Sequence, residues 1–152
     1  MSTRRLILLA LACGLAILVA GGVQLLRISN NEGSTLSLGD SAELATVGAS
    51  VAAAEVVDEH VRVVVRLSQD ASASGAFEGG LVGWSLLTGG LKEPVAAVAE
   101  TDGAVPSCDD LTVAPGSSVE CSLSFPVVPT RDGTTYVTFS FAGSSATWLL
   151  GL

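Results

Sequence analysis

The residue best suited to acid–base chemistry is His60, the only histidine in the chain, which directly follows Asp58 and Glu59. A histidine oriented by a carboxylate can act as a general base and can activate a serine nucleophile. The sequence contains no G-x-S-x-G motif, no P-loop and no G-x-G-x-x-G motif that would complete such a site. It therefore predicts no catalytic residue and no enzymatic activity, with His60 as a solvated residue of a turn.

Two small groups of acidic residues could offer oxygen ligands to Ca²⁺. Asp109 and Asp110 precede a predicted turn that leads to Glu120, and Glu100 lies close to Asp102. Calcium takes about six to eight oxygen ligands, and the spacing of an EF-hand loop is missing here. We therefore expect no metal ligands and no cofactor, and we interpret these carboxylates as ordinary loop charges.

Cys108 and Cys121 are predicted to form a structural disulfide. They are the only two cysteines after the N-terminal apolar segment, and an even number of thiols in an exported region favours pairing. Zinc binding or redox chemistry would need more ligands or a C-x-x-C spacing. The third cysteine, Cys13, lies inside the apolar segment with Ala10, not leucine, three positions before it, so we interpret it as an apolar thiol and not as a lipidation site.

Residues 6–26 form an apolar stretch in which Gln24 is the only strongly polar side chain. A helix of about 20 apolar residues is long enough to cross a bilayer. Arg4 and Arg5 make the N-terminal flank the more basic one, which predicts that residues 1–27 anchor the chain with its C-terminal part outside the cell. Cleavage after the small residues near Ala20 is the alternative, and it would release a secreted protein.

The exported part is strongly acidic. All 15 acidic residues follow Arg27, together with four basic ones, which gives this part a net charge of −11. Such a surface is soluble and repels phosphate groups, so nucleic acid is excluded as a partner.

Residues 28–40 are polar and aperiodic and are predicted to be a linker, followed by one domain over residues 41–152. Three segments, Val61–Leu67, Val119–Phe125 and Tyr136–Phe141, show a period of two that indicates half-buried antiparallel strands. In the first, Val61, Val63, Val65 and Leu67 share the inward face and both arginines face outward; in the second, the apolar residues alternate with Glu120, Ser122 and Ser124; in the third, Val137, Phe139 and Phe141 face inward and Tyr136, Thr138 and Ser140 outward. Five weaker strand patterns cover Ala42–Val47, Ala49–Val57, Leu81–Leu87, Pro94–Val98 and Ala146–Leu150. Short strands separated by turn residues predict an all-β, immunoglobulin-like antiparallel β-sandwich.

The segment from Leu111 to Val127, LTVAPGSSVECSLSFPV, combines a Pro-Gly turn, a cysteine and an alternating strand. With Gly83-Trp84-Ser85-Leu86 and Ala146-Thr147-Trp148, it resembles the small immunoglobulin-like domains of exported actinobacterial proteins. These are similar to the mycobacterial immunoprotective extracellular antigen, and many have no known function. The resemblance implies an immunoglobulin-like sandwich with a buried disulfide on the cell exterior, and it implies no catalytic residues.

We expect a membrane-anchored extracytoplasmic interaction module that binds an envelope or secreted protein. The alternative is an extracytoplasmic carrier of a small ligand or metal. Candidate contact residues are Arg62 and Arg66, which face outward and should pair with acidic neighbours, and the loop Gln69–Gly80. Trp84 and Trp148 fit the core of a sandwich, and they become contact residues only where they are exposed.

Overall fold

The computed structural model describes residues 13–14, 17, 34–89, 91–100, 104–127, 129 and 133–152. The chain divides into two compact units, Met1–Ser34 and Thr35–Leu152. The predicted membrane segment, residues 6–26, lies outside the described residues except at Cys13, Gly14 and Ile17. Within the described residues there is no helix of the length and apolar character needed to cross a membrane.

The described residues of the second unit form ten strands. They are β1 (Ser41–Leu44), β2 (Val47–Val57), β3 (His60–Gln69), β4 (Phe77–Glu78), β5 (Trp84–Thr88), β6 (Val95–Ala96), β7 (Thr112–Val113), β8 (Ser118–Phe125), β9 (Thr135–Phe141) and β10 (Ser144–Leu150). Each of the eight segments predicted as strands overlaps one of these. The sequence analysis missed β4 and β7, because two residues are too short to show an alternating pattern.

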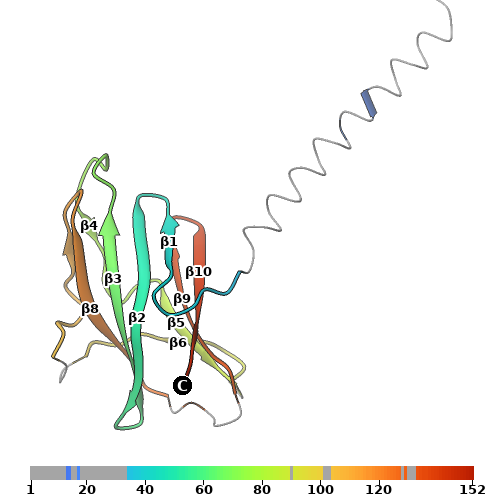
Figure 1. Cartoon of the computed structure of the whole chain (residues 1–152), viewed down its shortest axis with the longest axis vertical. Coiled ribbons are helices and arrows are strands. Elements are labelled where there is room, and N and C mark those ends of the chain that lie inside the picture. The colour runs from blue at the N-terminus through green and yellow to red at the C-terminus, as the bar shows by residue number, and fades with distance from the viewer. Residues whose placement is uncertain are drawn as a thin grey trace, which may run out of the picture. The chain divides into compact units, whose positions relative to one another are not determined.

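Two four-stranded antiparallel sheets form the layers of a β-sandwich (Figure 1). The first sheet has the order β1-β2-β3-β8 and the second has the order β10-β9-β5-β6, while β4 and β7 form a separate pair. Figure 1 shows the long strands β2 and β3 in front of the strands of the second sheet. The predicted all-β sandwich is therefore confirmed.

The sandwich begins earlier than the predicted domain boundary at residue 41. The backbone N–H of Leu36 donates to the carbonyl of Thr147 at 2.8 Å, and the N–H of Leu149 donates to the carbonyl of Leu36 at 2.9 Å. Gly39 donates to the carbonyl of Val51 at 2.8 Å. Residues 35–40, which the polar composition assigned to the linker, are therefore part of the folded unit.

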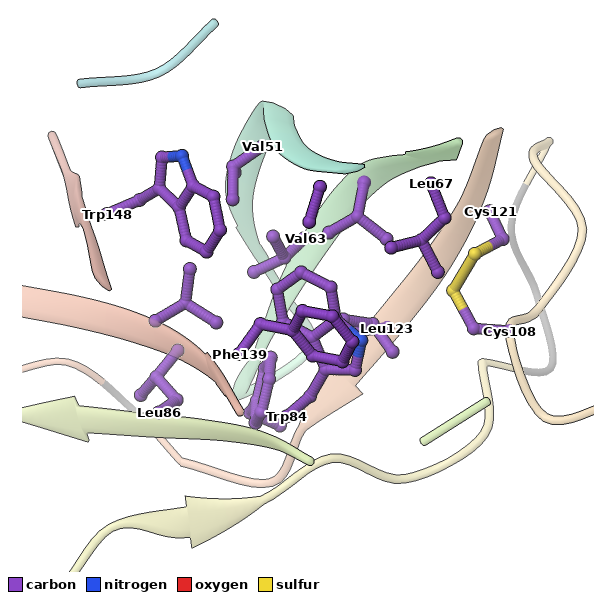
Figure 2. Close-up of a cluster of buried hydrophobic side chains, with 14 of the residues drawn as sticks. Val51, Val63, Leu67, Trp84, Leu86, Cys108, Cys121, Leu123, Phe139 and Trp148 are labelled. Atoms are coloured by element: carbon purple, nitrogen blue, oxygen red, sulfur yellow. A yellow bond between two sulfur atoms is a disulfide. The ribbon is translucent and has the colours of Figure 1, made fainter. Parts of the chain in front are cut away.

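The core lies between the inner faces of the two sheets (Figure 2). The inward set predicted for β3 is fully buried, namely Val61, Val63, Val65 and Leu67. Cys121, Leu123 and Phe125 of β8 are also fully buried, as their alternation with polar residues predicted. Period-two alternation thus identifies the core side of the central strands because successive side chains of a strand point to opposite faces.

Both tryptophans belong to this core. The ring of Trp84 stacks on that of Phe139 with centroids 4.4 Å apart, and the centroids of Trp84 and Trp148 lie 6.0 Å apart. Trp148 is fully buried and its indole N–H donates to the carbonyl of Asp40 at 2.9 Å. The core interpretation holds for both residues, so neither presents its ring to a partner in this structure.

Cys108 and Cys121 form a disulfide with a Cα–Cα distance of 5.1 Å, and both residues are fully buried, as predicted (Figure 2). The N–H of Cys108 donates to the carbonyl of Ser122 at 3.0 Å, and the N–H of Ser122 donates to the carbonyl of Pro106 at 2.8 Å. The disulfide therefore fastens the segment before β7 to the outer edge of β8.

Ser122 and Ser124 differ from the expectation for polar positions of a half-buried strand, because both are buried. Val98 forms a bridge with Ser124 and Ser107 forms one with Ser122, so other parts of the chain cover the edge of β8. The hydroxyl of Ser122 donates to the carbonyl of Val105 at 3.1 Å, which satisfies a polar group that would otherwise be buried without a partner.

Candidate interaction surface

The outer face of the first sheet is charged. Its outward strand positions include Glu43, Glu55, Arg62, Arg66 and Glu120. Arg62 and Arg66 point away from the core because they alternate along β3 with buried residues, and register places Glu55 and Glu120 on the same side. Register places Glu55 opposite Arg62 on the neighbouring strand, and it places Arg66 opposite Glu120. Opposite charges therefore face each other across the strands, the arrangement that stabilises cross-strand pairs.

Arg62 is the centre of the largest ion-pair network on this face. Its Nε and Nη2 atoms donate to the two carboxylate oxygens of Glu100 at 3.0 and 3.1 Å, and Nη1 donates to Glu55 at 3.1 Å. The hydrogen bonds that the guanidinium donates to Glu100, followed by the one that it donates to Glu55, raise the pKa of Arg62 above its usual range. Arg66 forms a single ion pair with Glu120 at 3.0 Å, and both side chains are well exposed. The two arginines therefore pair with acidic neighbours, as expected.

A shallow pocket of about 210 Å³ lies beside Arg62. It is lined by Val57, Asp58, His60, Arg62, Val98, Ala99, Glu100 and Ser124. The His60 ring nitrogen Nδ1 lies 2.9 Å from the backbone carbonyl oxygen of Asp58, and no hydrogen bond within the described residues joins His60 to Ser124. The pocket thus places a serine and a histidine near each other without the bond that would activate the serine.

The acidic groups weighed as calcium ligands do not assemble in the described part of the chain. Within residues 34–89, 91–100, 104–127, 129 and 133–152, no group of three His, Cys, Asp or Glu side chains is close enough to hold a metal ion. Glu120 contacts Arg66, and Glu100 contacts Arg62. Asp102 lies outside the described residues.

The outer face of the second sheet has no charged side chain at any of its strand positions. The outward residues are Ser85 and Leu87 of β5, Ala96 of β6, Tyr136, Thr138 and Ser140 of β9, and Ser145, Thr147 and Leu149 of β10. We call these nine residues the neutral face. The residues after Arg27 carry a net charge of −11, so a sheet face without charged strand positions is a clear asymmetry of the folded unit.

Register orders the neutral face into rows that run across the strands. Tyr136 lies between Leu87 on β5 and Leu149 on β10, which makes an apolar row. Leu87 and Leu149 are 40% and 41% exposed, and Tyr136 is partly exposed. The next row has Thr138 between Ser85 and Thr147, and the hydroxyl oxygens of Thr138 and Thr147 lie 2.9 Å apart. The large side chains of Leu87, Tyr136 and Leu149 thus form one row, and the small hydroxyl-bearing side chains of Ser85, Thr138 and Thr147 form the next.

The neutral face was not identified from the sequence, although Tyr136, Thr138 and Ser140 were placed on the outward side of their strand. What makes the surface is the side-by-side position of Leu87, Tyr136 and Leu149, which are far apart in the chain. Only the pairing register brings them together, and alternation within one strand carries no information about register between strands.

The predicted loop Gln69–Gly80 is ordered by its own side chains. The side-chain oxygen Oε1 of Gln69 accepts a hydrogen bond from the backbone N–H of Phe77 at 2.8 Å. The side-chain nitrogen Nε2 of Gln69 donates to the backbone carbonyl of Gly75 at 2.7 Å. Phe77 is buried and contacts Phe141 edge-to-face, with ring centroids 5.2 Å apart. The loop therefore packs onto the sandwich, and the described structure gives no reason to prefer it over the neutral face as a binding surface.

Comparisons with solved structures support the fold. The yjhA protein of Bacillus subtilis superimposes with a TM-score of 0.58 at 11% identity, covering 76% of this chain and 99% of that one. An uncharacterised β-sandwich protein of Clostridium difficile gives a TM-score of 0.51 at 9% identity, covering 78% and 95%. The candidate lipoprotein ycdA of Bacillus subtilis gives 0.52 at 12% identity, covering 72% of this chain and 38% of that one.

No protein-family model matches the sequence, and no curated protein matches it. At identities of 9–12% the structural similarity shows a shared small β-sandwich and nothing about activity. The expected fold type is thus supported, whereas the resemblance to exported actinobacterial domains and to the mycobacterial antigen stays a prediction.

Proposed function

We propose that the chain is a membrane-anchored, extracytoplasmic immunoglobulin-like module that binds another envelope or secreted protein through its neutral face. The observation that carries this proposal is the apolar row Leu87–Tyr136–Leu149 on a sheet face without charged strand positions. The cores of protein interfaces are depleted of charged residues and enriched in aromatic ones such as tyrosine. The neutral face has no charged strand position and carries Tyr136 in its middle strand, whereas the outer face of the first sheet carries at least five charged side chains.

The order of the strands supports the immunoglobulin-like part of the proposal. β2, β3 and β8 are neighbours in one sheet, and β10, β9 and β5 are neighbours in the other. This corresponds to the two sheets of an immunoglobulin domain, in which the first, second and fifth strands oppose the third, sixth and seventh. The disulfide differs from that of antibody domains, because it joins β8 to the segment before β7 and does not link the two sheets.

The membrane anchor rests on the sequence alone. Residues 6–26 are apolar, and two arginines precede them. Of the structural neighbours, ycdA is described as a candidate lipoprotein, a class of protein held at a membrane. The same location suits this chain, because an oxidising exterior also favours the disulfide between Cys108 and Cys121.

A photo-crosslinking amino acid at position 136 of the full chain, expressed in its native cells, tests the proposal. We expect it to capture one dominant envelope or secreted protein that mass spectrometry can identify. The same amino acid at position 66, on the charged face, is the matched control and should capture that protein at least about tenfold less. Equal capture from both positions, or capture of no protein at all, would refute the neutral face as the binding surface.

The carrier alternative has its best site in the pocket beside Arg62. Because Glu55 and Glu100 already accept hydrogen bonds from three guanidinium nitrogens of Arg62, little donor capacity is left for an anionic ligand. A rise in melting temperature on addition of Ca²⁺ or of a small-molecule panel would favour a carrier, since a ligand that binds only the folded state stabilises it.

A further inference from the structure

We infer that the neutral face binds a second copy of this chain, so that the module forms a symmetric dimer on the membrane. This inference rests on the proposed function and adds the identity of a partner. The exported part carries a net charge of −11, so two copies can meet only on a surface that avoids like charges.

Like charges decide which surfaces of two identical molecules can meet. The outer face of the first sheet carries Glu43, Glu55 and Glu120 next to its two arginines, and each arginine is already paired within the same molecule. Contact between two such faces would bury these ion pairs, with a desolvation penalty that their attraction does not reliably repay. The neutral face places no charged strand position opposite its copy, so it is the sheet face on which self-association costs least.

The rows of the neutral face are also self-complementary. Most homo-oligomers use a two-fold axis, which requires one surface patch to fit itself. β9 is flanked by β5 and β10, so an axis that runs along β9 places each β9 against its copy and each β5 against the other copy's β10. Leu87 of one molecule then meets Leu149 of the other, and Tyr136 meets its own copy.

The same axis sets the hydroxyl row of Thr138 and Thr147 against its copy. Apolar side chains thus contact apolar ones, and hydroxyl groups contact hydroxyl groups. Sheets that pack face to face keep their strands within about 30° of each other, which is compatible with this alignment. Strands of the two copies run in the same direction along the axis, so the N-terminal ends of the two folded units lie at the same end of the dimer.

The resulting dimer should be weak in dilute solution and favoured by tethering. The nine residues of the neutral face are fewer than the roughly 20–30 residues per partner of a standard stable interface. Confinement to one membrane raises the effective concentration of the second copy, as it does for linked binding sites. Salt should strengthen the dimer, because screening reduces the repulsion between two acidic domains.

Cysteine crosslinking of the full chain in lipid vesicles tests this inference. The background carries Cys13→Ser, so that the N-terminal segment contributes no thiol. Thr138→Cys reports on the neutral face, and Arg66→Cys at an exposed position of the first sheet is the control. With a short bismaleimide we expect Thr138→Cys to form at least about five times more dimer than Arg66→Cys, and we expect the yield to rise with salt.

Adding Leu149→Glu to the Thr138→Cys protein supplies the decisive comparison. Leu149 is 41% exposed, so the substitution leaves the core intact, and it should lower the dimer yield to the level of the control. Equal yields from Thr138→Cys and Arg66→Cys, or a yield insensitive to Leu149→Glu, would overturn the inference. If purified protein fails to dimerise while position 136 captures a different protein in cells, the neutral face is a binding surface and only the second copy is wrong. If position 136 captures no protein at all, both the proposed function and the inference fail.

Discussion

The side chain of Gln69 supplies the hydrogen-bond acceptor for the backbone N–H of Phe77, the first residue of β4. Its carbonyl oxygen accepts a hydrogen bond from the Phe77 N–H at 2.8 Å, while its amide donates to the carbonyl of Gly75 at 2.7 Å. Gln69 is itself buried at the end of β3, so both bonds form away from water. One amide thus holds the loop that carries Phe77 into the core.

Replacing Gln69 by alanine should lower the free energy of unfolding by about 1–3 kcal/mol, since it leaves the Phe77 N–H without its acceptor. Gln69→Glu keeps an acceptor oxygen but loses the donor to Gly75, so it should also destabilise the domain. Urea denaturation measures the change. Ser74→Ala, at an exposed position in the same loop, should stay within about 0.5 kcal/mol of the parent protein. A Gln69→Ala change of similar size to that control would show that the loop does not depend on this amide.

The disulfide closes a loop with a sequence separation of 13 residues. Replacing Cys108 and Cys121 together by alanine should cost about 3 kcal/mol of stability, because the unfolded chain regains the freedom that the crosslink removed. Chemical denaturation without reductant measures the loss. Cys13→Ala, outside the unit Thr35–Leu152, should leave the midpoint unchanged. A loss below about 1 kcal/mol for the double variant would contradict a stabilising role.

Alternation within single strands made the sandwich predictable. Val61, Val63 and Val65 of β3, and Val137 and Phe139 of β9, were assigned to the core from spacing alone, and all are buried. The disulfide could be predicted as well, because few cysteines were available to pair. Local sequence was sufficient in these cases because the information lies in one strand or in a residue count.

The features that the sequence did not reveal all depend on contacts between distant segments. Ser122 is buried because Ser107 and Pro106 pair with the edge of β8, and no pattern near Ser122 signals this. The row Leu87–Tyr136–Leu149 exists only through the register of three strands. The topology and register of the strands decide which surface residues become neighbours, and the sequence of a single strand does not contain this information.

The turn between β2 and β3, which was expected beside His60, consists of Asp58-Glu59 and lacks the glycine that usually marks a two-residue hairpin. Both residues have positive φ angles, 46° at Asp58 and 65° at Glu59. Glycine adopts this backbone region without the steric cost of a Cβ atom. Glu59→Gly should therefore stabilise the domain by about 1 kcal/mol in a denaturation experiment. Glu43→Gly, in the interior of β1, should destabilise it by about 0.5–1 kcal/mol, and a loss of stability in Glu59→Gly as well would contradict the strain argument.

Asp70 gives the domain a pH-dependent contribution to stability. The backbone N–H of Ser72, and then its hydroxyl, donate to Oδ1 of Asp70 at 2.7 Å and lower the pKa of this carboxyl. With a folded-state pKa below the unfolded value of about 3.9, the contribution is present above that value and is lost as the pH falls through the folded pKa. Asp70→Asn should thus be less stable than the parent protein at neutral pH, with the difference decreasing as the pH falls through the folded-state pKa.

Ser72→Ala provides the control for Asp70, because it removes the hydroxyl donor and leaves the backbone donor in place. In that background the pH-dependent difference between Asp70 and asparagine should be smaller but still present. A difference of equal size at neutral pH and in acid would exclude the carboxylate as its origin.

Arg62 should matter more for stability than Arg66, although both lie on the same face of β3. Arg62 holds both oxygens of Glu100, whose side chain is only 9% exposed, and it also contacts Glu55. Truncating Arg62 leaves a largely buried carboxylate without this partner, whereas Arg66 and Glu120 are 61% and 41% exposed and solvent can replace their contact. We therefore expect Arg62→Ala to lower the melting temperature clearly and Arg66→Ala to change it little. High salt should abolish the small effect of Arg66→Ala and preserve that of Arg62→Ala, and equal effects of the two substitutions would contradict the assignment of the network to Arg62.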